Sequence, residues 1–289
     1  MTIQHIVMAG GGYLGLYHLG ILTRLLKNNY LQQSSIKSIY GTSIGAFFGA
    51  VFCLNDNWEN TMDYFIRRPW HKVFHITPNK VFQALSKKGL FDKETFDQCL
   101  LPLLKTRNFD ETMTLHDLYE LSNISLYMYT IDLNTFTLIE LSHESHPNMR
   151  MLDALYMTCS LPYLFQPHFY ESKCYIDGGL LCSYPVKQCL ERVDEHSTVL
   201  GLRFNSSQSI KRIEEHHNVF EYGYFLYRAL IQNIRDINYP TIPHEISIPC
   251  TQMNMNDGTR IASSIEERQT MIQTSHQLAD RFLGTIERL

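Results

Sequence analysis

Residues 36–54 read IKSIYGTSIGAFFGAVFCL, and this stretch decides the fold. The short apolar run at 36–40 predicts a buried strand, and the small and apolar residues at 46–54 predict a buried helix. Between them, Gly-Thr-Ser-Ile-Gly at 41–45 predicts a sharp turn, because glycine removes the Cβ atoms that would clash where a strand and a helix nearly touch. The sequence therefore predicts a strand, a turn and a helix in succession, with a serine at the apex.

Ser43, at the apex of this turn, is the candidate nucleophile. A serine on a tight strand-to-helix turn is held in a strained backbone conformation with its hydroxyl exposed, which suits nucleophilic attack. An ordinary strand–helix connection is the alternative, because the pentapeptide alone is only moderate evidence. The residues that would shape a nucleophile turn around the serine are Gly41, Ile44 and Gly45.

A second strand–loop–helix pattern precedes this one. Residues 3–9 predict a buried strand, and leucines at helical spacing between residues 16 and 26 predict a helix. The glycines of the loop between them are Gly10, Gly11, Gly12 and Gly15. The loop is therefore rich enough in glycine to bring backbone N–H groups close to a ligand.

Four interpretations of this glycine loop compete. A dinucleotide site needs an acidic residue after the second strand, but no Asp or Glu precedes Asp56. A phosphate loop needs Gly-Lys-Ser/Thr, and no lysine follows Gly15. An oxyanion hole needs only backbone N–H groups beside a nucleophile, and the serine turn supplies that nucleophile. A tight turn without function is the fourth interpretation, and we favour the oxyanion hole.

The base for a serine nucleophile is the next requirement, and Asp177 is the candidate. A short run at 174–176 predicts a strand, and Gly178 and Gly179 then let the chain bend away so that the carboxylate projects. A structural Asp-Gly-Gly turn remains the alternative, as does a histidine base held by an acid. None of the 13 histidines lies in a glycine turn or at a clear strand end. A histidine-based triad stays open, and the alternative is a dyad in which a buried Asp177 itself accepts the proton, since burial makes a carboxylate a stronger base.

The bulk composition excludes several classes of protein. With 289 residues, 44% of them apolar, the chain can bury one large α/β core or two small ones. A net charge of −4 argues against nucleic-acid binding. Seven cysteines without a C-x-x-C pair predict reduced thiols and a reducing, cytoplasmic compartment. We see no signal-peptide pattern, and the longest apolar stretch, 44–54, is too short to span a bilayer.

Residues 55–105 predict a cap-like helical insertion of different character. Between residues 67 and 91 there are six Lys or Arg and no acid, interleaved with aromatic residues. Such a stretch suits peripheral contact with an anionic membrane, although a solvated cap whose aromatics pack on the core is the alternative. Residues 93–105 predict a further helix that Pro102 ends or bends. His71 and His75 lack a third ligand nearby, so we expect no metal there.

The remaining elements follow from periodicity and turn signals. Strands are predicted at 125–130, 136–141, 198–204 and 244–250, and helices at 115–121, 152–158, 210–237 and 261–289.

Four blocks in order give the chain a resemblance to the patatin-like phospholipase family, from Ile3 to about Gly201. They are Gly10–Gly15 with Tyr17-His18-Leu19-Gly20, Gly41–Gly45, Thr158–Pro162 through Phe165, and Asp177-Gly178-Gly179 with Pro185. In the family these are the oxyanion block, the nucleophile elbow, a Ser/Pro/Phe block and the catalytic-acid block. One departure is Leu14, where members usually carry Lys or Arg.

The resemblance implies a three-layer α/β/α fold with a central, largely parallel sheet and a helical cap. It implies a Ser43–Asp177 dyad that hydrolyses acyl esters of phospholipids or related lipids, as a phospholipase A does, without metal or cofactor. We expect one domain over residues 1–289, with a core at 3–205 and a C-terminal extension at 206–289. A non-catalytic lipid-binding protein and an esterase or thioesterase for soluble acyl groups remain the alternatives.

Overall fold

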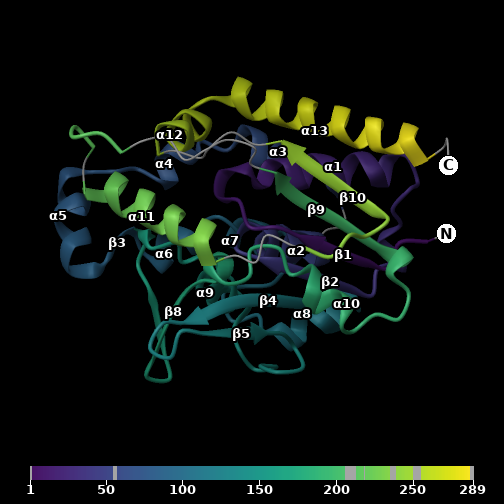
Figure 1. Ribbon diagram of the computed structural model, residues 1–289, viewed down its shortest axis with the longest axis horizontal. Helices are drawn as coiled ribbons and strands as arrows, with labels where there is room; N and C mark the ends of the chain where they lie inside the picture. The colour runs from purple at the N-terminus through teal and green to yellow at the C-terminus, as the bar shows by residue number, and fades with distance from the viewer. Residues whose placement is uncertain are drawn as a thin grey trace.

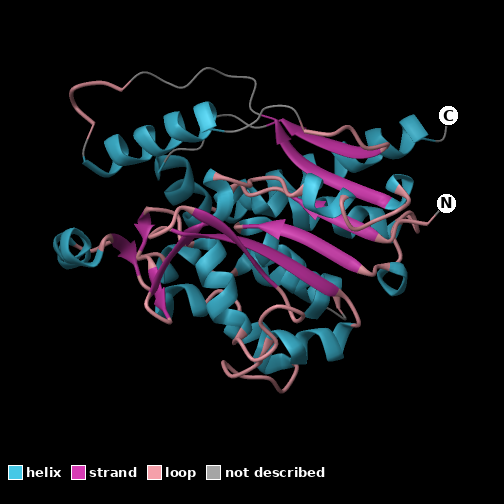
Figure 2. Ribbon diagram, turned by 60° about the horizontal axis from the view of Figure 1, so that its bottom comes forward, coloured by secondary structure: helices cyan, strands magenta, loops and turns pink. Residues whose placement is uncertain are grey.

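A central β-sheet organises the molecule (Figures 1 and 2). The computed structural model of the chain describes residues 2–54, 57–205, 213–217, 219–234, 239–249 and 255–286. Over these residues the main sheet has eight strands in the order β10-β9-β1-β2-β4-β8-β7, with β5 also paired to β4. The strands are β1 (His5–Met8), β2 (Ser38–Thr42), β4 (Ser125–Asp132), β5 (Thr137–Leu141), β7 (His168–Tyr170), β8 (Lys173–Asp177), β9 (Val199–Asn205) and β10 (His244–Pro249).

The sheet is largely parallel, as the family resemblance implies. β10, β9, β1, β2 and β4 run parallel, whereas β5 and β8 are antiparallel to β4 and β7 is antiparallel to β8. The carboxyl ends of parallel strands share one edge of a sheet, which is where sites form in α/β folds. Figure 1 shows the arrowheads of β4, β9 and β10 pointing toward the side where α5 (Pro78–Lys87) and α11 (Val219–Ile234) lie.

Neighbouring residues of a strand contribute to different faces of the sheet, because side chains alternate along each strand. One face carries a larger apolar cluster than the other. Ile6 and Met8 of β1 join the larger apolar cluster, which also contains residues of α1, α2, α9 and α13. Val7 and Tyr40 join a smaller cluster on the other face, together with residues of the short α10. The elements of these layers are α1 (Leu16–Lys27), α2 (Ile44–Leu54), α8 (Leu115–Ser122), α9 (Met151–Cys159), α10 (Val186–Leu190) and α13 (Ile265–Ile286). The arrangement is the predicted three-layer α/β fold.

The helical insertion differs from the prediction in two places. It contains α3 (Trp58–Arg67), α4 (Trp70–Val73), α5, α6 (Lys93–Asp97) and α7 (Leu101–Thr106), together with the strand β3 (Gly89–Phe91). The single helix predicted at 93–105 was wrong, because the chain breaks after Asp97 and Pro102 lies in the first turn of α7, where its missing N–H costs nothing. Strand β3 was not predicted, and it forms because β6 (Tyr163–Phe165) lies beside it.

The C-terminal part adds a strand and helices to the core. β10 extends the main sheet beside β9, and α13 packs along α1. The helix predicted at 261–289 is instead α12 (Met255–Ser263) followed by α13, with Ser264 capping the second helix through the Glu267 N–H. The helix predicted at 210–237 is described as α11, and residues 213–217 before it are not helical. Residues 210–212, 218, 235–238 and 287–289, and Cys250, lie outside the described residues.

Short 3-10 helices connect the larger elements. They are η1 (Gly12–Gly15), η2 (Gln33–Ser35), η3 (Gly178–Leu180) and η4 (His196–Thr198). All six cysteines in the described part of the chain are buried, and none of these six forms a disulfide bond, as predicted. None of the described helices is both long enough and apolar enough to cross a bilayer.

Candidate active site

Ser43 lies on the sharp turn between β2 and α2 that the sequence predicts. Its φ of 54° is in the left-handed region, which costs a non-glycine residue about 1 kcal/mol. A Cβ atom on Gly45 would clash with the Met8 carbonyl oxygen, and one on Gly41 would lie 2.5 Å from the Ala46 nitrogen. Both glycines are therefore required where strand and helix meet, and the turn holds Ser43, whose residue surface is only 8% exposed, in a strained conformation.

Hydrogen bonds to two other segments fix the backbone of this turn. The Ser43 N–H donates to Thr158 Oγ1 over 2.9 Å, and the Thr158 hydroxyl donates to the Tyr129 carbonyl oxygen over 2.5 Å. The Thr42 hydroxyl donates to the Cys182 carbonyl oxygen over 2.7 Å. Thr158 therefore connects the nucleophile turn to β4. Sequence reasoning missed this role, since no pattern shows that a hydroxyl from α9 reaches Ser43.

Asp177 ends β8 and lies opposite Thr130 of β4. Its residue surface is 4% exposed, its Oδ1 accepts the Gly179 N–H over 2.6 Å, and its own N–H donates to the Ser160 carbonyl oxygen over 3.0 Å. A Cβ atom on Gly178 would clash with the Tyr129 carbonyl oxygen. The two glycines thus have separate roles, since Gly178 permits close approach to β4 and Gly179 donates to the carboxylate.

The side chain of Cys159 interacts with both Ser43 and Asp177. Burial, followed by the nearby charge of Asp177, raises the pKa of the Cys159 thiol well above its usual range, while a hydrogen bond with the Ser43 side chain acts in the opposite direction. The neighbours of Cys159 bind the same two residues, because Thr158 accepts the Ser43 N–H and Ser160 accepts the Asp177 N–H. The segment 158–160 therefore brings the predicted nucleophile and the predicted acid together.

The glycine loop runs directly beside the serine turn. The Cβ position of Gly10 is 3.3 Å from the Ser43 Cβ, and a Cβ on Gly15 would clash with the Ile44 side chain. Gly12 has a φ of 53°. The Gly10 N–H donates to the Ser183 carbonyl oxygen over 2.8 Å, so it is already engaged. Among the described residues, the N–H groups of Gly11 and Gly12 donate to no backbone carbonyl oxygen.

Leu14, within the glycine loop, and His18, in α1, both have buried side chains. Leu14 is buried in the larger apolar cluster, so the position where the family usually carries a cation contributes to the core in this chain. His18 is fully buried, and its Nε2 lies 2.8 Å from the Ala9 carbonyl oxygen, immediately before Gly10. Its ring packs on Phe204 with centroids 4.8 Å apart. His18 thus supports the strand end from which the loop starts.

His18 should make the fold less stable in mild acid. Burial lowers the pKa of His18 to about 4, only partly offset by the bond to Ala9. Because the folded pKa is below the unfolded value of about 6.5, the unfolded chain binds more protons between these values, and stability is lost as pH falls through this window. The loss between pH 7 and pH 5 should be about 2 kcal/mol from His18 alone.

Urea unfolding of the unsubstituted chain and of His18→Gln at pH 7 and pH 5 measures this contribution. Glutamine can still donate to the Ala9 carbonyl oxygen but does not titrate, so its pH dependence should be smaller by about 2 kcal/mol. The other histidines remain in both chains and cancel in the comparison. Equal pH dependence of the two chains would contradict a buried, neutral His18.

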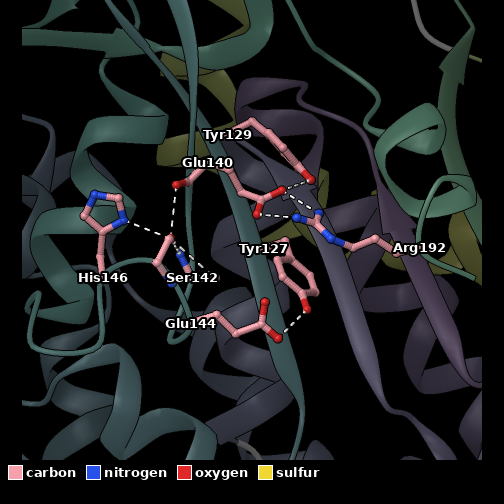
Figure 3. Close-up of polar contacts among 8 residues, drawn as sticks. Tyr127, Tyr129, Glu140, Ser142, Glu144, His146 and Arg192 are labelled. Atoms are coloured by element: carbon pink, nitrogen blue, oxygen red, sulfur yellow. Dashed lines mark hydrogen bonds and ion pairs between the residues drawn. The ribbon is translucent and has the colours of Figure 1, made fainter.

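Hydrogen bonds among the side chains of Tyr129, Glu140 and Arg192 hold strand β4 in place. Figure 3 shows the Tyr129 and Arg192 side chains converging on Glu140. The Tyr129 hydroxyl donates to Glu140 Oε2 over 2.7 Å, and Arg192 donates to both carboxylate oxygens over 2.6 and 2.8 Å. Tyr127 and Glu144, drawn in the same view, line a cavity of about 410 Å³ near the amino ends of the strands, away from Ser43. The network therefore fixes β4, whose Tyr129 carbonyl oxygen binds Thr158.

The largely parallel sheet carries a strained serine on the turn after its second strand. This strand–turn–helix geometry is that of an α/β protein with a nucleophile-elbow turn. The family model for patatin-like phospholipases matches residues 6–190, and the chain belongs to this family. The match contains all four segments that meet at the site.

Individual relatives are distant. An uncharacterized protein of Acanthamoeba polyphaga mimivirus is 20% identical over 277 residues, which cover 96% of this chain and 85% of the relative. A protein described as a probable lipid hydrolase of Invertebrate iridescent virus 6 is 22% identical over 183 residues, covering 63% of this chain and 61% of the relative. The crystal structure of VipD from Legionella pneumophila is similar with a TM-score of 0.55 and 15% identity, covering 98% of this chain and 67% of that one. At this identity the structural likeness concerns the fold.

Proposed function

We propose that the chain is a lipid acyl hydrolase of the phospholipase A type, with Ser43 as nucleophile and Asp177 as base. The observation that carries the proposal is that the segment 158–160 binds both residues, since Thr158 accepts the Ser43 N–H and the Ser160 carbonyl oxygen accepts the Asp177 N–H. Membership of the patatin-like phospholipase family supports lipid hydrolysis in general, as does the similarity to the iridescent-virus protein described as a probable lipid hydrolase.

The first half of the reaction forms an acyl-enzyme. Asp177 takes the proton of the Ser43 hydroxyl while Oγ attacks the carbonyl carbon of the ester. The carbonyl electrons move to its oxygen, and the resulting oxyanion is held by the N–H groups of Gly11 and Gly12, with that of Ile44 as a further donor. When the carbonyl re-forms, the alcohol or lysolipid leaves and takes the proton from Asp177. The acyl group is then bonded to Ser43 Oγ.

The second half reverses the roles. Asp177 takes a proton from water, and the hydroxide attacks the acyl carbon to form a second oxyanion in the same loop. Collapse of this intermediate releases the fatty acid and returns the proton to Ser43. We expect no metal or cofactor in either half, so a chelator should leave the rate unchanged.

The surroundings favour each charge that forms. Asp177 is 4% exposed, so little water competes with the Ser43 hydroxyl for its carboxylate, while the Gly179 N–H holds Oδ1 in place. The N-termini of α1 and α2 follow the glycine loop and Ser43 directly, and their dipoles favour negative charge there. Because Leu14 supplies no cation, backbone N–H groups carry oxyanion stabilisation without help from that position.

Thr158→Val should impair the proposed reaction and the fold together. Valine has the shape of threonine but leaves the buried Ser43 N–H and Tyr129 carbonyl oxygen without this partner, which should cost about 1–3 kcal/mol of stability. The turnover number should fall by about tenfold or more, because Ser43 is no longer held in place. Urea unfolding and ester hydrolysis measure the two effects. Thr158→Ser keeps the hydroxyl and should restore both, whereas an unchanged turnover number in Thr158→Val would show that Thr158 does not position Ser43.

The product analysis that tests the proposed function uses a mixed lipid extract. The purified chain and its Ser43→Ala variant are incubated with the extract, and released fatty acids and lysolipids are measured by mass spectrometry. The proposal predicts fatty acid and lysolipid from the unsubstituted chain only. Release from soluble acyl esters but not from lipids would favour an esterase or thioesterase instead.

A non-catalytic lipid-binding protein is the second candidate, and Leu14 is the observation that favours it. A chain that has lost the usual cation beside the oxyanion loop has weaker support for the transition state. If the extract yields no fatty acid while the chain still binds lipid, this second candidate replaces the first.

We also propose that residues 67–91 contact a membrane surface. Phe82 and Leu85 of α5 are 76% and 72% exposed, so these two side chains do not pack on the core. Lys72, Lys87 and Lys88 are exposed as well, and no described carboxylate forms an ion pair with them. Exposed apolar side chains flanked by unpaired lysines suit an anionic bilayer.

A further inference from the structure

Helix α11 exposes a row of apolar side chains along its length. The exposed fractions of Val219, Tyr222, Leu226 and Leu230 lie between 45 and 57%. Their spacing of three, four and four residues places them on one side of the helix. Single exposed apolar residues are common, but a continuous row on one helix marks a surface that contacts something apolar.

The same helix lies against the candidate active site. α11 packs on η3, which follows Asp177 directly, and on β6. Gly223 of α11 is so close to Tyr163 of β6 that a Cβ atom there would lie 2.8 Å from the ring. Gly223 lies about one helical turn from both Val219 and Leu226, so the exposed row runs beside this contact. The apolar row therefore borders the acid turn.

Helix α5 shares this side of the molecule. The strand β3, which follows α5 in the chain, pairs with β6, and α11 also contacts β6. In Figure 1, α5 and α11 both lie toward the end of the molecule to which the arrowheads of β4, β9 and β10 point. The two exposed apolar surfaces are thus linked through β6 and flank the carboxyl edge of the sheet.

We propose that the α11 row and the exposed face of α5 together form one docking surface for an anionic lipid bilayer, with the Ser43–Asp177 site between them. The proposal rests on the proposed lipid substrate and adds the second contact and the orientation. Docking through both helices would turn the carboxyl edge of the sheet, and so the site, toward the lipid.

The charge on the α5 side favours an anionic bilayer over other apolar partners. The α5 side presents Lys72, Lys87 and Lys88 without described ion-pair partners, and a lysine near an anionic leaflet contributes attraction that salt screens. The α11 row supplies apolar side chains that can enter the region between headgroups and acyl chains. A second copy of the same chain would bring these lysines toward one another, which disfavours self-association through this face.

Vesicle binding in the Ser43→Ala background tests the proposal without consuming the lipid. Vesicles of phosphatidylcholine, with and without phosphatidylserine, are sedimented with each of four proteins. The first carries Ser43→Ala alone. The other three add one further change to it: the pair Leu226→Ser/Leu230→Ser, the pair Phe82→Ser/Leu85→Ser, or the single substitution Leu121→Ser. Each pair change should weaken binding to the anionic vesicles by at least about tenfold, and added salt should weaken the binding that remains. Leu121 of α8 is 38% exposed and lies near the amino ends of the strands, so Leu121→Ser should bind as Ser43→Ala does.

The outcomes separate this inference from the proposed function. Unchanged binding in Leu226→Ser/Leu230→Ser would overturn the α11 contact, and so would equal loss in Leu121→Ser. Self-association detected by light scattering and abolished by the α11 pair would assign the row to a second copy instead. If the chain with intact Ser43 hydrolyses no lipid while the predicted binding pattern holds, the docking surface stands and the hydrolase proposal fails.

Discussion

Replacing Ser43 with alanine should reduce fatty-acid release by at least about a thousandfold while the chain stays folded. Alanine removes the oxygen that forms the acyl bond and leaves the glycine loop and Asp177 in place. The Ser43 N–H remains and can still donate to Thr158, so the turn keeps its main support. Lipid hydrolysis followed by mass spectrometry measures the loss, and circular dichroism on heating checks the fold.

Ser43→Gly is the matched control for backbone strain. Alanine keeps the cost of a side chain at a φ of 54°, whereas glycine relieves it but gains freedom in the unfolded chain. The two effects are each about 1 kcal/mol, so Ser43→Gly should be no less stable than Ser43→Ala and equally inactive. Substantial hydrolysis by either variant would contradict a Ser43 nucleophile.

Replacing Asp177 with asparagine should lower the turnover number by about 10²–10⁴-fold. Asparagine keeps the shape of the side chain and an oxygen that can accept the Gly179 N–H, so the acid turn should persist. It cannot accept the Ser43 proton, and both halves of the reaction lose their base. Steady-state hydrolysis of one purified phospholipid across a pH range measures the effect.

Histidine variants provide the control for this second prediction. His18 is close to the glycine loop, but its Nε2 is bonded to Ala9 and its pKa is about 4, so His18→Gln should remain active. Full activity in Asp177→Asn, together with loss in a histidine variant, would mean that a histidine-based triad does the work.

Much of the fold could be predicted from sequence because its signals are local. The run at 36–54 predicts strand, turn and helix, and each is present, with glycine where Met8 and Ala46 approach the turn. Family membership is confirmed over residues 6–190. The Ser43–Asp177 dyad stays a prediction, although both residues donate hydrogen bonds to the segment 158–160.

The remaining features depend on contacts between segments far apart in the chain. β3 forms only because β6 lies beside it, and Pro102 begins a helix because the preceding turn at Cys99 and Leu100 separates α6 from α7. The role of Thr158 depends on a hydroxyl that reaches another element. The sequence shows that α11 is apolar, but only packing decides which of its side chains remain exposed.

Labelling with a fluorophosphonate probe tests the central claim most directly. The probe bonds to an activated serine, and mass spectrometry of peptides locates the bond. The account predicts a single label, on Ser43, in the unsubstituted chain. In Asp177→Asn the rate of labelling should be lower by at least about a hundredfold, because the base has been removed. A label on another residue, no label, or an unchanged rate in Asp177→Asn would contradict it.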